Sequence, residues 1–125
     1  AETQINHRST GIIGLPGNIK VAVLVDGGSA SASEILAGAL KDHGIAKVVG
    51  TKTFGKGSVQ ELVSLEGGAS LKVTIAKWFT PNGVNISEHG ITPDFEVQAT
   101  TTLKMKDGTV RDLQLEKAIE VLNKK

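Results

Sequence analysis

The sequence predicts an α/β fold, because a strand, an amphipathic helix and a second strand follow one another within about thirty residues. Residues 19–25 (IKVAVLV) form a nearly continuous apolar run, which is typical of a strand buried on both faces of a parallel sheet. Residues 31–43 are predicted to be helical, and Gly44 to end the helix. The helix has an apolar stripe that consists of Ile35, Leu36, Ala39 and Leu40. The run AKVVG at 46–50 supplies the second strand, so the three elements form a βαβ unit.

A β-hairpin is predicted downstream of this unit. Residues 59–65 and 69–79 read as its strands, and the sequence between them, Glu-Gly-Gly, reads as its turn. In the second strand, apolar Leu71, Val73 and Ile75 alternate with more polar residues, which predicts one buried and one wetter face.

The chain divides into four segments by composition. Residues 1–18 form a polar N-terminal segment, 19–99 the α/β core, and 100–110 a polar hinge. Residues 111–125 are predicted to form an amphipathic helix. Its apolar face would consist of Leu113, Leu115, Ala118, Ile119 and Leu122.

Composition excludes several classes of function. The 125 residues fit one domain, and 14 basic against 13 acidic residues argue against a nucleic-acid-binding surface. The absence of cysteine excludes disulfides, thiolate metal sites and a cysteine nucleophile, and three scattered histidines argue against a metal centre. We expect no metal and no cofactor. No apolar run is long enough for a transmembrane helix, and no signal-peptide pattern is expected at the N-terminus.

The stretch DGGSASASEILAGAL (26–40) holds three serines before the helix. Ser31 and Glu34 match the S-x-x-E capping box, in which Ser31 would be worth about 1 kcal/mol as N-cap. Ser31 also lies where a buried strand turns into a helix, a position at which ligands collect in α/β sheets. There the Ala32 N–H could stabilise an oxyanion, and Gly27 and Gly28 leave room for a substrate backbone. The pattern alone leaves capping and catalysis open.

A catalytic serine needs a base. His43 lies at the far end of the helix, roughly 18 Å from Ser31 at 1.5 Å rise per residue. His7 and His89 cannot be placed near Ser31. Lys56 fits better, because the glycines of TFGKGSVQ would let its side chain point inward, and burial would lower the pKa of a lysine. The alternative is an ordinary solvated loop lysine.

Residues 21–60 (VAVLVDGGSASASEILAGALKDHGIAKVVGTKTFGKGSVQ) and 71–97 (LKVTIAKWFTPNGVNISEHGITPDFEV) resemble the carboxyl-terminal processing, or tail-specific, proteases of serine peptidase family S41. The resemblance implies a ClpP/crotonase-like protease core, of which this chain is the C-terminal part. It also implies a Ser-Lys dyad with Ser31 as nucleophile and Lys56, 25 residues later, as general base. Gln60 would support Lys56, and Ala32 N–H would be one oxyanion donor. Ser29 and Ser33 would be structural.

The same resemblance implies a function and a location. The family consists of endopeptidases that cleave proteins near apolar C-terminal tails without metal or cofactor. We therefore expect protein or peptide substrates, no nucleic acid, and in the full-length protein a PDZ domain and the remaining core; a homo-oligomer is compatible with this. The location implied is extracytoplasmic: the bacterial cell envelope, the periplasm or the secreted fraction, or a plastid lumen.

One family motif, L-R-x-N-P-G-G, which supplies the second oxyanion N–H, is missing from this sequence. That absence favours an alternative in which the chain is a catalytically incomplete fragment that acts as a non-catalytic interaction or assembly module. A crotonase-like enzyme acting on a small molecule is a third reading, which rests on fold analogy alone.

Overall fold

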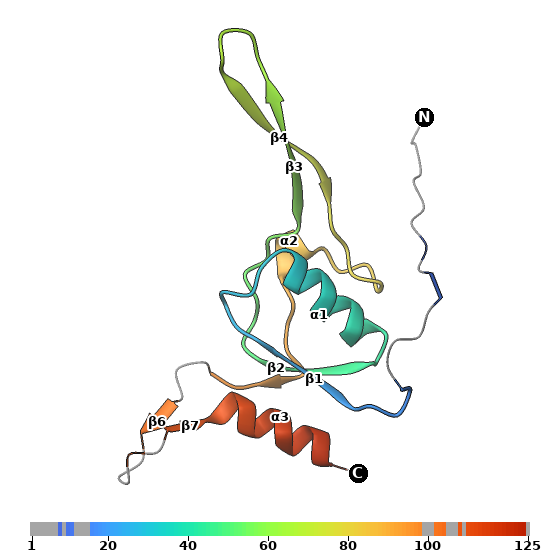
Figure 1. Ribbon diagram of the computed structural model, residues 1–125, viewed down its shortest axis with the longest axis vertical. Helices are drawn as coiled ribbons and strands as arrows, with labels where there is room; N and C mark the ends of the chain where they lie inside the picture. The colour runs from blue at the N-terminus through green and yellow to red at the C-terminus, as the bar shows by residue number, and fades with distance from the viewer. Residues whose placement is uncertain are drawn as a thin grey trace.

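A three-stranded parallel sheet forms the centre of the computed structural model (Figure 1). Its strands, in the order β1-β2-β5, are Val21–Val25, Ala46–Gly50 and Phe95–Glu96. The Asp94 backbone and carboxylate both bond to Val48, which fixes β5 against β2. The structure describes residues 8, 10–11, 16–98, 102–104, 108 and 110–124, so most of the predicted N-terminal segment lies outside the described residues.

Helix α1 (Ala32–Asp42) joins β1 to β2, and the parallel pairing of these strands confirms the predicted βαβ unit. Gly44, with φ +67°, ends the helix as predicted. The predicted apolar stripe is only partly correct: Ile35, Ala39 and Leu40 are half-buried, but Leu36 is 60% exposed. The fully buried positions of the helix are Glu34, Ala37 and Gly38. The reason is close packing: a Cβ on Gly38 would lie 2.9 Å from a methyl carbon of Thr80. The helix therefore packs through its smallest side chains.

Helix α3 (Leu113–Asn123) covers the face of the sheet opposite α1 (Figure 1). It confirms the predicted C-terminal helix, although Leu115 and Ile119 are exposed while Ala118 is buried. The prediction that the first strand is buried on both faces is wrong, because Leu24 is 43% exposed. The cause is that β1 is an edge strand of the sheet.

The predicted hairpin is present and projects away from the sheet and helices (Figure 1). It consists of β3 (Ser58–Ser64) and β4 (Ser70–Lys77). Its predicted buried face is not buried, since every residue of β4 is exposed. Because the hairpin extends beyond both helices, none of the described residues covers its apolar face.

Two short elements complete the fold. The one-turn helix α2 (Ile86–His89) follows the hairpin. In the segment predicted as a hinge (100–110), β6 (Thr102–Lys104) pairs with β7 (Val110–Asp112) in a short antiparallel ladder. Strand β7 extends into the predicted C-terminal helix, which begins at Leu113 and not at residue 111. None of the helices in the described parts of the chain combines the length and apolar character that a membrane crossing requires.

Candidate active site

Ser31 occupies a strained turn between β1 and α1. Its backbone has φ 55° and ψ −119°, and it is the one non-glycine residue with positive φ among those the structure describes. Such a conformation costs about 1–3 kcal/mol and is concentrated at functional sites. A sharp strand-to-helix turn presents the nucleophilic serine in α/β-hydrolases.

The Ser31 hydroxyl does not cap the helix. The Ser31 and Glu34 backbones and side chains lie as in a capping box, but the Glu34 N–H donates to the Ser31 carbonyl oxygen (2.9 Å), and the cap has no side-chain hydrogen bond. The reverse half of the box is formed, since the Ser31 N–H donates to Glu34 Oε2 at 2.9 Å. The capping-box arrangement is thus present in both directions, with the Ser31 side chain toward the Glu34 N–H but without a cap hydrogen bond from it.

The residues before Ser31 form a hydrogen-bonded turn, and the residue after it, Ala32, has a backbone N–H without an acceptor in the described chain. The Asp26 carboxylate accepts the Gly28 N–H (2.9 Å), and it also accepts the Ser29 N–H (3.0 Å) and hydroxyl. Ser29 is thus held in the turn, consistent with its predicted structural role. Ala32 N–H has no acceptor within the described chain, as expected at the first position of a helix. A Cβ placed on Gly27 would have only one atom within 4 Å, the Lys52 carbonyl oxygen at 4.0 Å, so there is open space beside this residue.

The loop that carries Lys56 lies directly against the serine turn. The Phe54 N–H donates to the Ser29 carbonyl oxygen (3.0 Å). The Lys56 N–H donates to Glu34 Oε2 (2.8 Å), the same oxygen that accepts the Ser31 N–H. The backbone nitrogens of Ser31 and Lys56 are therefore at most about 6 Å apart, since both lie within hydrogen-bond distance of one atom. The fold thus brings the two predicted catalytic residues together from positions far apart in the sequence.

Glu34 is fully buried and is the charged centre of this arrangement. Its other oxygen, Oε1, accepts the Gly55 N–H (2.7 Å) and the Thr53 hydroxyl. Burial by itself would raise the pKa of Glu34, but the hydrogen bonds from Thr53, Gly55, Lys56 and Ser31 outweigh it and lower the pKa below its ordinary value of 4.5. The carboxylate is therefore ionised at neutral pH.

The side chains of Lys56 and Gln60 do not meet. Lys56 is exposed, which agrees with the solvated loop lysine that the sequence left open and not with the inward-pointing one. Gln60 is also exposed, and its amide nitrogen lies 3.5 Å from the Thr74 hydroxyl across the hairpin. The structure therefore does not bring the Gln60 side chain into a hydrogen bond with Lys56.

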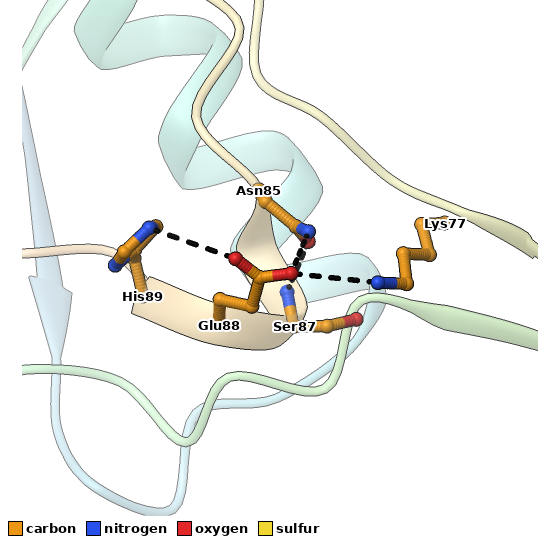
Figure 2. A network of polar contacts seen from close by, with 5 residues as sticks. All are labelled: Lys77, Asn85, Ser87, Glu88 and His89. Atoms are coloured by element: carbon orange, nitrogen blue, oxygen red, sulfur yellow. Dashed lines mark hydrogen bonds and ion pairs between the residues drawn. The ribbon is translucent and has the colours of Figure 1, made fainter.

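Helix α2 packs against the loop that carries Lys56. A Cβ on Gly57 would lie 2.7 Å from Ile86 Cβ and 2.8 Å from the Ser87 nitrogen, so the loop and helix are in close contact. Figure 2 shows the polar contacts of this helix: the Glu88 carboxylate accepts from Asn85 (2.7 Å) and lies 3.4 Å from Lys77 Nζ. Because Lys77 ends β4, this carboxylate joins α2 to the base of the hairpin.

Sequence reasoning treated Glu34 only as a cap residue and did not identify Thr53. A signal for Glu34 was present, since it precedes Ala37 and Gly38 by three and four positions and so shares their helix face. Its partners in the lysine loop are about twenty residues away, and no local pattern indicates them. Among the described residues, no group of three or more histidines and acidic residues is placed to hold a metal ion.

Comparisons with known proteins give a consistent result. The profile of peptidase family S41 matches residues 3–97. A carboxy-terminal-processing protease of Bartonella bacilliformis is 50% identical over 86 residues, which are 69% of this chain and 20% of the relative. Carboxyl-terminal-processing peptidase 3, chloroplastic, of Arabidopsis thaliana is 54% identical over 81 residues, 65% of this chain and 15% of the relative.

A solved structure agrees with the sequence relatives. The photosystem II D1 C-terminal processing protease matches with a TM-score of 0.64 and 42% identity, over 73% of this chain and 24% of that chain. This chain therefore spans a quarter or less of the length of these three proteins.

Proposed function

The chain belongs to peptidase family S41, and on that premise we propose that it carries the catalytic serine and lysine of a serine endopeptidase. Ser31 is the nucleophile, Lys56 the general base, and Ala32 N–H one oxyanion donor. Gln60 helps to position Lys56 once substrate or further parts of the protein bring their side chains together. Gly27 and Gly28 leave space for the substrate backbone.

The chemistry is peptide-bond hydrolysis in two steps. Neutral Lys56 accepts the proton of the Ser31 hydroxyl as the oxygen attacks the scissile carbonyl carbon. The C–N bond then breaks, the protonated lysine gives its proton to the leaving amine, and an acyl ester of Ser31 remains. Water then attacks this ester while Lys56 accepts one of its protons. The bond between the acyl carbon and the Ser31 oxygen breaks, Lys56 returns the proton to that oxygen, and the acid leaves. Ala32 N–H stabilises the negative oxygen formed in each step.

One observation carries this proposal: the backbone N–H groups of Ser31 and Lys56 donate to the same oxygen of Glu34. A single atom thus ties the strained serine turn to the lysine loop. The strained backbone of Ser31 supports the same assignment, because such conformations are concentrated at functional sites.

Two relatives are named for carboxy-terminal processing, which supports a proposal about the substrate class. We propose substrates that are proteins or peptides with apolar C-terminal tails. A PDZ domain and the remainder of the core would complete the enzyme. We further propose an extracytoplasmic location in the envelope, periplasm or secreted fraction, or a plastid lumen; one relative is named as chloroplastic.

A second candidate function is a catalytically incomplete module that binds other protein surfaces. Two observations favour it for the chain by itself. Lys56 is exposed, and none of the described elements encloses its side chain as the site of a lysine base would. The apolar face of the β3–β4 hairpin is also exposed, as expected of a surface that packs against another part of a protein.

A peptide-cleavage assay separates the two functions. The assay uses a quenched-fluorescence peptide with an apolar C-terminus and compares the wild-type chain with Ser31→Ala and Lys56→Ala. The endopeptidase proposal expects cleavage by the wild type that both substitutions abolish. Cleavage that Ser31→Ala leaves unchanged would exclude Ser31 as nucleophile, and no cleavage by any of the three would favour the non-catalytic module.

A further inference from the structure

Glu34 has a set of partners that a helix cap does not need. Its side chain is fully buried, and both of its oxygens accept two hydrogen bonds each. One partner, the Ser31 N–H, belongs to its own helix turn. The other three, from Thr53, Gly55 and Lys56, belong to the lysine loop about twenty residues later.

We propose that Glu34 is a positioning residue for the Ser31–Lys56 pair; the inference rests on the proposed function. The carboxylate holds the amide of the nucleophile and the amide of the base on one oxygen, Oε2. It also offsets the backbone strain at Ser31, because the hydrogen bond to Ser31 N–H holds that residue in its strained conformation. Glu34 acts through the two backbones and does not touch the reacting atoms.

The chemistry of the partners requires an ionised carboxylate at this position. All four partners are donors, and an ionised carboxylate is the side chain that offers only acceptors. A glutamine has the same shape, but it replaces one oxygen with an NH₂ group that would face two donors. Glu34→Gln is therefore a nearly isosteric change that removes half of the acceptors.

A purely structural role predicts different behaviour from a positioning role. Helix α1 packs through two other residues, Ala37 against the sheet and Gly38 against the segment after the hairpin. Neither residue bonds to the amides of the lysine loop. If Glu34 only stabilised the fold, any variant of equal stability would keep the same turnover. If it positions the pair, turnover per folded molecule falls with Glu34→Gln alone.

The experiment measures kcat and KM for the quenched-fluorescence peptide, with rates normalised to the folded fraction. It compares wild type, Ser31→Ala, Glu34→Gln and two controls. Val48→Ala destabilises the core without touching the network, since Val48 is fully buried in β2. Glu120→Gln removes an exposed carboxylate of α3 that pairs with lysines. We expect Glu34→Gln to lower kcat about a hundredfold at nearly constant KM, and both controls to keep wild-type kcat.

A spectroscopic measurement on the wild type accompanies the kinetics, because Glu34→Gln could fail to fold. We expect the amide protons of Ser31, Gly55 and Lys56 to shift together with pH, with one midpoint below the ordinary glutamate pKa of 4.5. Independent midpoints for Ser31 and Lys56 would overturn the inference.

The kinetic outcomes distinguish the two levels of the proposal. If wild type cleaves, Ser31→Ala does not, and Glu34→Gln stays within twofold of wild-type kcat, the inference about Glu34 is wrong and the proposed function stands. A fall in kcat that Val48→Ala reproduces per folded molecule would also overturn it. If wild type and Ser31→Ala do not differ, the proposed function fails and the inference fails with it.

Discussion

The strained conformation of Ser31 makes a quantitative prediction that does not depend on catalysis. At φ 55° and ψ −119°, a side chain costs about 1–3 kcal/mol relative to glycine, which adopts this conformation freely. Glycine also loses more entropy on folding, which costs about 0.4–1 kcal/mol. We therefore expect Ser31→Gly to be about 1 kcal/mol more stable than Ser31→Ala.

The comparison with wild type sharpens this prediction. Because the Ser31 hydroxyl makes no cap hydrogen bond, Ser31→Ala should lie within about 0.5 kcal/mol of wild type. Ser33 provides a matched control, since it is an exposed serine two positions later with ordinary helical backbone. At Ser33 the order reverses, and glycine should be less stable than alanine by up to about 1 kcal/mol.

Urea unfolding followed by circular dichroism measures these free energies, and thermal unfolding gives an independent reading of about 4 °C per kcal/mol for a chain of this size. If Ser31→Ala is as stable as Ser31→Gly, the turn is not strained and the structural argument for Ser31 is refuted. If glycine is favoured equally at Ser33, the effect has nothing to do with the turn.

Three further predictions test other parts of the account. Gly57→Ala should cost about 1–3 kcal/mol because its Cβ would meet the backbone of α2, whereas Gly17→Ala, with no atom within 4 Å, should be neutral in urea unfolding; equal effects would contradict the packing. Because the pKa of Glu34 is lowered in the folded chain, its contribution to stability is complete above its ordinary value of 4.5 and is lost as pH falls through the folded pKa. As the pH falls below 4.5, the unfolding free energy of wild type should therefore fall more steeply than that of Glu34→Gln, and parallel curves would contradict this. Ile75→Lys on the exposed face of the hairpin should change stability by less than about 0.5 kcal/mol, and a larger loss would show that another surface covers this face.

The sequence was sufficient for the local elements of the fold. The strand-helix-strand unit and the hairpin follow from apolar periodicity and glycine positions, which are local signals. Burial was predicted less well. The apolar residues of β4 alternate as in a half-buried strand, yet their partner surface is not in the described chain. The periodicity of apolar residues indicates which face of a strand is apolar, but it does not indicate which surface packs against that face.

The candidate site was predictable in part. The Ser-x-x-Glu spacing and the glycines around Lys56 indicated a turn and a loop, and the family resemblance joined them. The role of Glu34 was not predictable, because its hydrogen bonds to the lysine loop depend on the packing of α1 against β2. The sequence left Lys56 open between an inward-pointing and a solvated side chain, and the structure shows the solvated one.

The most direct test of the central claim is the site of covalent labelling by a serine-reactive fluorophosphonate, read by mass spectrometry of the digested chain. The account predicts one phosphonate on Ser31, none on Ser29 or Ser33, and loss of labelling in Lys56→Ala. Labelling spread over the three serines, or labelling of Ser31 that Lys56→Ala leaves unchanged, would contradict the claim that Ser31 and Lys56 act as a pair.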